Sequence, residues 1–166
     1  QEPKDTVGLL KRVKDGVLIA IEKIKIEYPN FTISTATYDD LGNVKELLSF
    51  EELELILGNI DNHRILNKAL LLLKSEFFED SQLGELLNQH QFNLRENLKI
   101  STPKIDRMIE AGLDAGALGG KINGSGGGGC MFMYAPENPE KVAQSIEKHG
   151  GKAYIITVDE GTRIEN

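Results

Sequence analysis

The sequence predicts an α+β domain, because a run of helices is followed by a strand, a glycine loop, a second strand, a helix and a third strand. Through the first two thirds of the chain, apolar residues recur every three or four positions, which is the period of an amphipathic helix. Beyond residue 118 this period gives way to short apolar segments bounded by glycine and proline. The 166 residues are enough for one domain with a core of its own.

The first predicted helix carries one long apolar stripe and ends at Pro29 and Asn30. The stripe consists of Val7, Leu10, Val13, Val17, Ile21, Ile24 and Tyr28. Residues 31–37 are rich in β-branched side chains and predict a short strand. Helices over about residues 40–49 and 51–78 are expected next, with Gly58 as a candidate break in the second.

The following two helices are predicted from their start signals. Ser81 is a candidate N-cap of the first, whose inner face consists of Leu83, Leu86, Leu87, His90, Leu94 and Leu98. Thr102 and Pro103 predict the start of the second, because threonine can accept a bond from a free N–H and proline lacks a donor that the first helical position leaves unused. Gly116 is placed to end that helix.

The tail of the chain has a different pattern. Two apolar segments, 119–123 and 130–135, predict strands on either side of a glycine loop. A short helix is expected over 139–149, followed by a strand over 152–159.

Composition excludes several classes of function. The formal net charge of −7 disfavours a nucleic-acid partner, which requires a concentrated basic face. No apolar run approaches the length of a membrane span, and the polar N-terminus shows no signal peptide. The single cysteine, Cys130, excludes an internal disulfide and fits a reducing cytoplasm. The histidines and the cysteine lack metal-ligand spacing, so no metal site is predicted.

The informative segment is the loop between the two predicted strands, where six positions hold five glycines and one serine. Glycine is costly inside a folded chain and is tolerated where the backbone needs positive φ or where a ligand approaches closely. Successive N–H groups in such a loop form a concave array of donors for phosphate oxygens, and a serine hydroxyl adds another. The candidate binding residues are therefore Gly124, Ser125, Gly126, Gly127, Gly128 and Gly129.

Other interpretations of this loop are weaker. A plain hairpin turn needs only one or two glycines, and a flexible linker would not have apolar strands directly on both sides. The loop matches the spacing G-x-G-x-x-G, but the dinucleotide fingerprint requires a helix to follow, and here a strand follows. No Gly-Lys-Ser/Thr completes a Walker A loop. A loop that contacts an anion or a nucleotide is favoured, with a structural turn as the open alternative.

The segment Lys121–Cys130 resembles the third sequence motif of the GHMP kinases, Lys-x-Thr-Gly-Ala-Gly-x-Gly-Gly-Cys. It departs from that pattern at Asn123, which replaces threonine, and at Ser125, which replaces alanine. Two upstream stretches, His90–Arg95 and Ile100–Asp106, look like the His…Leu-Arg and Ser-x-Pro-x-x-Asp elements of galactokinases. The combination is specific, whereas any one of these motifs alone would be weak.

The resemblance implies a ferredoxin-like GHMP kinase C-terminal domain over residues 1–166, with an antiparallel sheet backed by helices. It implies phosphoryl transfer from ATP with Mg²⁺ to a hydroxyl of a small sugar, as in a galactokinase. A heptose-phosphate kinase, another GHMP kinase and a non-catalytic ligand-sensing module stay as alternatives. The family's first two motifs and its catalytic aspartate belong to an N-terminal kinase half, which is the expected partner. We therefore assign no catalytic residue in this chain and expect it to be inactive alone.

The other polar residues of the matched stretches have structural explanations. His90 falls on an apolar stripe and is expected to be a core histidine, and Arg95 is expected to pair with a neighbouring glutamate. Asp106 lies in the first turn of its helix, where negative charge is favourable. Lys121 can neutralise phosphate or point to solvent, and Cys130 is expected to be a buried small apolar residue.

Overall fold

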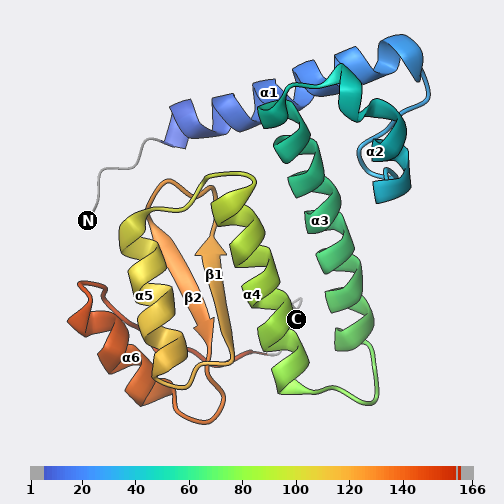
Figure 1. Ribbon diagram of the computed structural model, residues 1–166. Helices are drawn as coiled ribbons and strands as arrows, with labels where there is room; N and C mark the ends of the chain where they lie inside the picture. Colours follow the sequence, from blue (N-terminus) through green and yellow to red (C-terminus); the bar gives the residue numbers. More distant parts are fainter. Residues whose placement is uncertain (1–5, 160, 162–166) are drawn as a thin grey trace, which may run out of the picture.

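The computed structural model describes residues 6–159 and 161. Its elements in chain order are α1 (Thr6–Glu27), α2 (Tyr38–Val44), η1 (Lys45–Leu47), α3 (Phe50–Leu73), α4 (Asp80–Glu96), α5 (Pro103–Asp114), β1 (Gly119–Asn123), β2 (Cys130–Tyr134) and α6 (Pro139–Lys148). In Figure 1 the helices α1 to α3 lie beside a second group that consists of α4, α5, α6 and the two strands. The predicted α+β class, with an antiparallel sheet backed by helices, is confirmed.

The N-terminal helices pack around an apolar cluster of their own. It consists of Ala20, Ile24, Leu41, Val44, Ile56 and Ile60, from α1, α2 and α3. A capping box starts α3, because the Ser49 hydroxyl accepts from the Glu52 N–H at 3.3 Å and the Glu52 carboxylate accepts from the Ser49 N–H at 2.8 Å. The helix continues without a break past Gly58, where an added Cβ would lie 2.8 Å from the Leu98 side chain. Gly58 is therefore a site of close helix contact and not the predicted break.

The two strands form a hairpin whose outer edge is covered by α4. Gly119 pairs with Tyr134 and Asn123 pairs with Cys130 in antiparallel register. At the edge of β1 that does not pair with β2, the Asn88 side-chain amide donates to the Leu118 carbonyl and accepts from the Gly120 N–H. The side-chain carbonyl of Gln91 accepts from the Ile122 N–H at 2.9 Å. Amide side chains thus take the place of a further strand at this edge.

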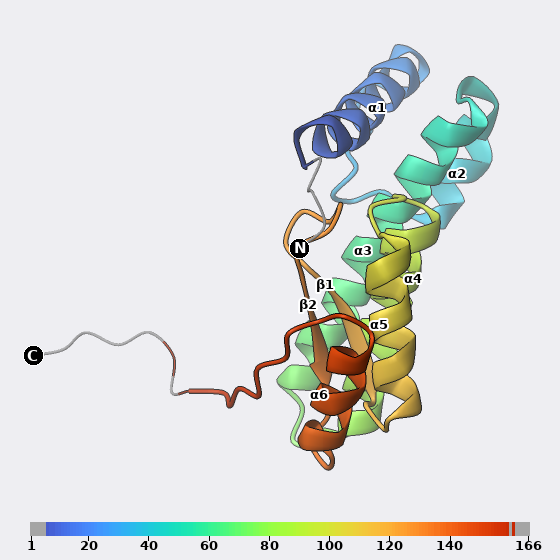
Figure 2. The same ribbon diagram turned by 90° about the vertical axis from the view of Figure 1, so that its left-hand side faces the viewer.

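Helices cover one face of the hairpin, as Figure 2 shows for α4 and α5. The core on that face consists of Leu55, Leu94, Leu98, Ile100, Ile105, Met108, Ile109 and Ile122. The start of α5 confirms the predicted cap, because the Thr102 hydroxyl accepts from the Ile105 N–H at 3.3 Å and Pro103 is the first helical residue. Gly116 follows the helix with a φ of +108°, as expected of a residue that ends it.

Two predicted strands are wrong. Residues 31–37 form a turn between α1 and α2, because the Thr32 carbonyl accepts from the N–H groups of Thr35 and Ala36. Residues 152–159 form no strand, and their large apolar side chains, Tyr154, Ile155, Ile156 and Val158, are exposed. The amide side chains of α4 already occupy the free edge of β1, so that edge offers no pairing for this segment.

Two helix boundaries also differ from prediction. The helix α3 ends at Leu73, and α4 begins at Asp80 with Glu79 before it, so Ser81 lies inside the helix and is not its cap. None of the helices in the described part of the chain combines the length and apolar character that a membrane crossing demands.

Candidate functional site

The glycine loop joins β1 to β2 and has an unusual backbone. The φ angles are +89° at Gly124, +76° at Gly126, +68° at Gly127, +110° at Gly128 and +90° at Gly129. All five glycines therefore adopt conformations that other residues rarely occupy. The density of glycine in the sequence is explained by the backbone of the loop and not by flexibility.

The loop is fixed to the segment between α4 and α5. The Gly127 N–H donates to the Ile100 carbonyl at 2.8 Å. At Gly126 an added Cβ would lie 2.5 Å from the same carbonyl oxygen, which is closer than any real contact. The Gly127 amide is therefore directed into the protein. Position 126 requires glycine because its backbone lies directly against the backbone of Ile100, which leaves no room for a side chain.

The remaining loop residues differ in exposure. Gly126 and Gly128 are buried, Ser125 and Gly127 are half-buried, and Gly124 and Gly129 are exposed. An added Cβ at Gly124 would meet no atom within 4 Å. The outer surface of the predicted site is thus formed by Gly124, Ser125 and Gly129, while the middle of the loop serves as its anchor.

A chain of side-chain hydrogen bonds braces the strand that leads into the loop. Gln91, buried on α4, accepts from the Ile122 N–H at 2.9 Å and donates to the Ser101 hydroxyl at 3.2 Å. The Ser101 hydroxyl donates to the Asp106 carboxylate at 2.5 Å. Asp106 stands in the first turn of α5, which agrees with its predicted role at that helix terminus. The network joins β1, α4 and α5 immediately before the loop begins.

Lys121 and His90 lie in a partly desolvated part of the site. The Lys121 ammonium donates to the Ile122 carbonyl at 2.6 Å and stands 5.4 Å from the centre of the Phe132 ring. Burial lowers the pKa of Lys121 below its usual value. Burial, and then the positive charge of Lys121, lower the pKa of His90 to about 4. The His90 imidazole is therefore neutral at neutral pH, which fits a partly buried structural histidine.

Cys130 is exposed, so its predicted burial is wrong. The pairing register explains the difference, because successive residues of a strand point to opposite faces of a sheet. Met131 and Met133 pack on the core face, whereas Cys130 and Phe132 share the other face with Lys121. Since every residue of this strand is apolar or small, its sequence holds no alternation from which the outer face could be predicted.

Sequence reasoning correctly assigned Arg95 to an ion pair and missed the residues that anchor the loop. Arg95 pairs with Glu96 at 2.7 Å. Gln91 had a usable signal, since an amide on an otherwise apolar helix face needs a buried partner. Ile100 had no such signal in the sequence, because it anchors the loop through its backbone carbonyl and not through its side chain.

The family described as "GHMP kinases C terminal" matches residues 73–152, which include α4, α5, both strands, the glycine loop and α6. The chain belongs to the GHMP kinase family and contains its C-terminal domain. The predicted family resemblance is thereby confirmed.

The relatives that match the chain include mevalonate kinases and galactokinases. The mevalonate kinase of Pyrococcus furiosus is 39% identical over 166 residues, covering 90% of this chain and 49% of the relative. The mevalonate kinase of Thermococcus onnurineus is 39% identical over 135 residues, covering 75% of the chain and 40% of the relative. The galactokinase of Actinobacillus succinogenes is 32% identical over 111 residues, covering 61% and 28%. The chain thus spans less than half the length of each of these curated relatives.

Proposed function

We propose that this chain is the C-terminal part of an ATP-dependent GHMP small-molecule kinase, and that its glycine loop forms one wall of the phosphoryl-transfer cleft. The observation that carries the proposal is the loop itself, in which five positive-φ glycines are held rigidly on a hairpin inside the stretch that matches the family. Phosphoryl transfer requires accurate positioning and neutralisation of charge more than covalent participation by the protein. A fixed array of backbone donors meets that requirement.

Each part of the loop has a separate role in this proposal. The outer residues Gly124, Ser125 and Gly129 face the phosphate oxygens with their N–H groups and the serine hydroxyl. The inner residues Gly126 and Gly127 hold the loop against Ile100. ATP with Mg²⁺ would supply the phosphoryl group, and an N-terminal kinase half would supply the groups that activate the acceptor hydroxyl.

Mevalonate is the first candidate for the phosphoryl acceptor. Mevalonate kinases match up to 90% of the chain at 39% identity, whereas the galactokinase match covers 61% of the chain at 32% identity. The His90–Arg95 and Ile100–Asp106 stretches keep galactose as the second candidate. We therefore rank mevalonate above the sugar that the sequence motifs predicted as the phosphoryl acceptor.

The test is ADP release by the full-length protein with Mg-ATP and either mevalonate or galactose. We expect turnover with mevalonate, and a variant Gly126→Val should lose about 100-fold or more of that turnover, because the added side chain displaces the loop from Ile100. The matched control is Gly42→Ala in α2, where an added Cβ meets no atom within 4 Å. Unchanged turnover in folded Gly126→Val would contradict the role of the loop, and turnover with galactose alone would reverse the order of acceptors.

A further inference from the structure

The glycine loop depends on the short connection between α4 and α5. Ile100 in that connection supplies the carbonyl that accepts from Gly127 and that passes against Gly126. The Ile100 side chain is buried in the core, so its backbone cannot shift without disturbing the packing below. The position of the loop is therefore set by the position of residues 98–100.

This connection has an unusual backbone. Lys99 has a φ of +52° and is the one described residue other than glycine with positive φ. A positive φ is unfavourable for a residue with a side chain, and it persists only where the surrounding structure holds the backbone in place. The Lys99 ammonium pairs with Glu54 of α3 at 2.7 Å, and the Ile100 N–H donates to the Leu94 carbonyl at 2.9 Å.

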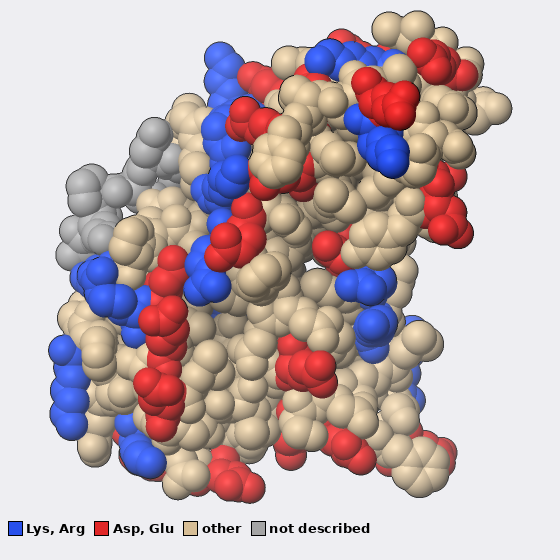
Figure 3. Space-filling model, viewed as in Figure 1, with Lys and Arg blue, Asp and Glu red and all other residues tan. Residues whose placement is uncertain are grey.

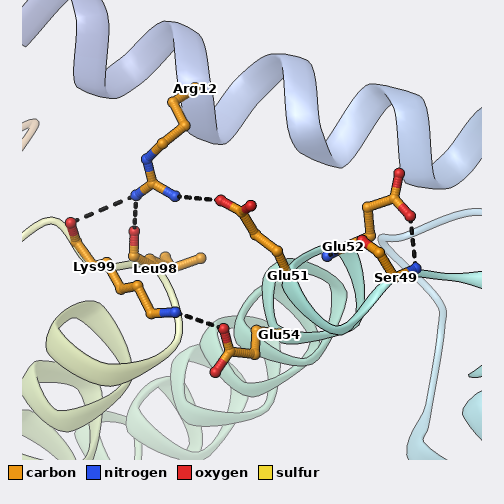
Figure 4. Close-up of polar contacts among 7 residues, drawn as sticks. All are labelled: Arg12, Ser49, Glu51, Glu52, Glu54, Leu98 and Lys99. Atoms are coloured by element: carbon orange, nitrogen blue, oxygen red, sulfur yellow. Dashed lines mark hydrogen bonds and ion pairs between the residues drawn. The ribbon is translucent and has the colours of Figure 1, made fainter.

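The third support comes from α1, across 86 residues of sequence. The Arg12 guanidinium donates to the Leu98 carbonyl at 2.7 Å and more weakly to the Lys99 carbonyl at 3.5 Å. A second nitrogen of the same group donates to the Glu51 carboxylate at 3.3 Å, as Figure 4 shows. In Figure 3 basic and acidic side chains lie side by side where α1 passes the end of α4.

The two carbonyls are suitable partners for a cation. They follow the C-terminus of α4, where unpaired carbonyl groups carry the negative end of the helix dipole. A planar guanidinium can bond two neighbouring carbonyls and a carboxylate at once, which an ammonium cannot do in the same geometry. The apolar side chains of Leu9 and Val13 pack against the same core cluster as Ile100, so α1 is a firm base for Arg12.

We propose that Arg12 is a positioning residue of the glycine loop, which holds residues 98–100 from α1 so that the Ile100 carbonyl fixes Gly126 and Gly127. The link to phosphoryl transfer rests on the proposed function, whereas the link to the loop rests on the contacts alone. In this proposal Arg12 acts through Ile100 and not through a contact of its own with the loop.

The direct test is amide hydrogen exchange in the full-length protein, measured on peptides that cover residues 124–129. Arg12→Ala should accelerate exchange in the loop about ten-fold, because its anchor is released. Arg12→Lys should restore part of the protection through a single bond to Leu98, and Lys11→Ala, which removes an exposed charge from the same turn, should change nothing. Unchanged loop exchange in Arg12→Ala, or equal acceleration in α3 and the loop, would overturn the proposal.

A kinetic measurement separates this proposal from the proposed function. If the protein is a kinase, Arg12→Ala should lower kcat about ten-fold with little change in the KM for ATP, and Arg12→Lys should recover part of the loss. A fall in affinity without a fall in kcat would contradict a positioning role. A wild-type protein without kinase activity would contradict the proposed function, and loop exchange in Arg12→Ala would still decide the role of Arg12.

Discussion

The N-terminal helices and the β1–β2 hairpin are held in place by different means. In the helical region the contacts that define the structure are between apolar side chains, such as Ile24, Val44 and Ile56, which are almost completely buried. Around the hairpin the defining contacts involve backbone groups, which are bonded by Gln91 and by the Ile100 carbonyl. Burial of apolar side chains is non-directional, whereas a backbone hydrogen bond also constrains the distance and the angle between its two groups. The loop that we propose as the phosphate site is in the region built from backbone contacts.

The largest expected effect on stability belongs to the helical region. Ile56→Ala removes a fully buried side chain and should lower the free energy of unfolding by about 2–5 kcal/mol, as cavity-forming substitutions do. Urea denaturation measures this change. At temperatures where the variant stays folded, hydrogen exchange in residues 124–129 should match that of the wild type, and faster exchange there would show that the two regions are not separable.

A smaller loss is expected from the hairpin side. Gln91→Leu leaves the Ile122 N–H without its acceptor and removes one of the two bonds of the Ser101 hydroxyl, which keeps its bond to Asp106. The substitution should cost about 1–3 kcal/mol. In contrast with Ile56→Ala, it should also accelerate exchange in the loop. The control is Gln89→Leu on the same helix, where the side chain bonds Glu85 at an exposed position. Equal effects of the two substitutions would contradict a special role for Gln91.

The smallest effect concerns pH. The folded protein holds the pKa of His90 at about 4, below the usual 6.5, so the unfolded chain binds a proton that the folded chain does not bind between these values. This contribution to stability is complete above pH 6.5 and is lost as the pH falls toward 4. His90→Gln should therefore flatten the dependence of stability on pH within that window, measured by urea denaturation at several pH values. An identical slope in both proteins would show that His90 is not the group responsible.

Local signals predicted the helices well. The start of α5 followed from Thr102 and Pro103, and α1 followed from its apolar period, because caps and periodicity depend on neighbouring residues. The glycine loop was also found from sequence, since five glycines in six positions have few structural uses. Its contact with phosphate stays a prediction.

Contacts between distant segments could not be predicted in the same way. Residues 152–159 have the composition of a strand, but whether they pair depends on which groups already occupy the hairpin edge. The exposure of Cys130 depends on register, which an all-apolar strand does not encode. Arg12 is one of many basic residues on an exposed helix until the fold brings Leu98 beside it. Each of these features is decided by tertiary contacts.

We propose that the outer surface of the glycine loop receives the phosphates of a nucleotide. The most direct measurement is amide hydrogen exchange of residues 124–129 in the full-length protein, with and without Mg-ATP or a non-hydrolysable analogue. We predict that saturating nucleotide slows exchange at Gly124, Ser125 and Gly129, while Gly127, already bonded to Ile100, changes little. Nucleotide binding that leaves exchange throughout the loop unchanged would contradict the claim.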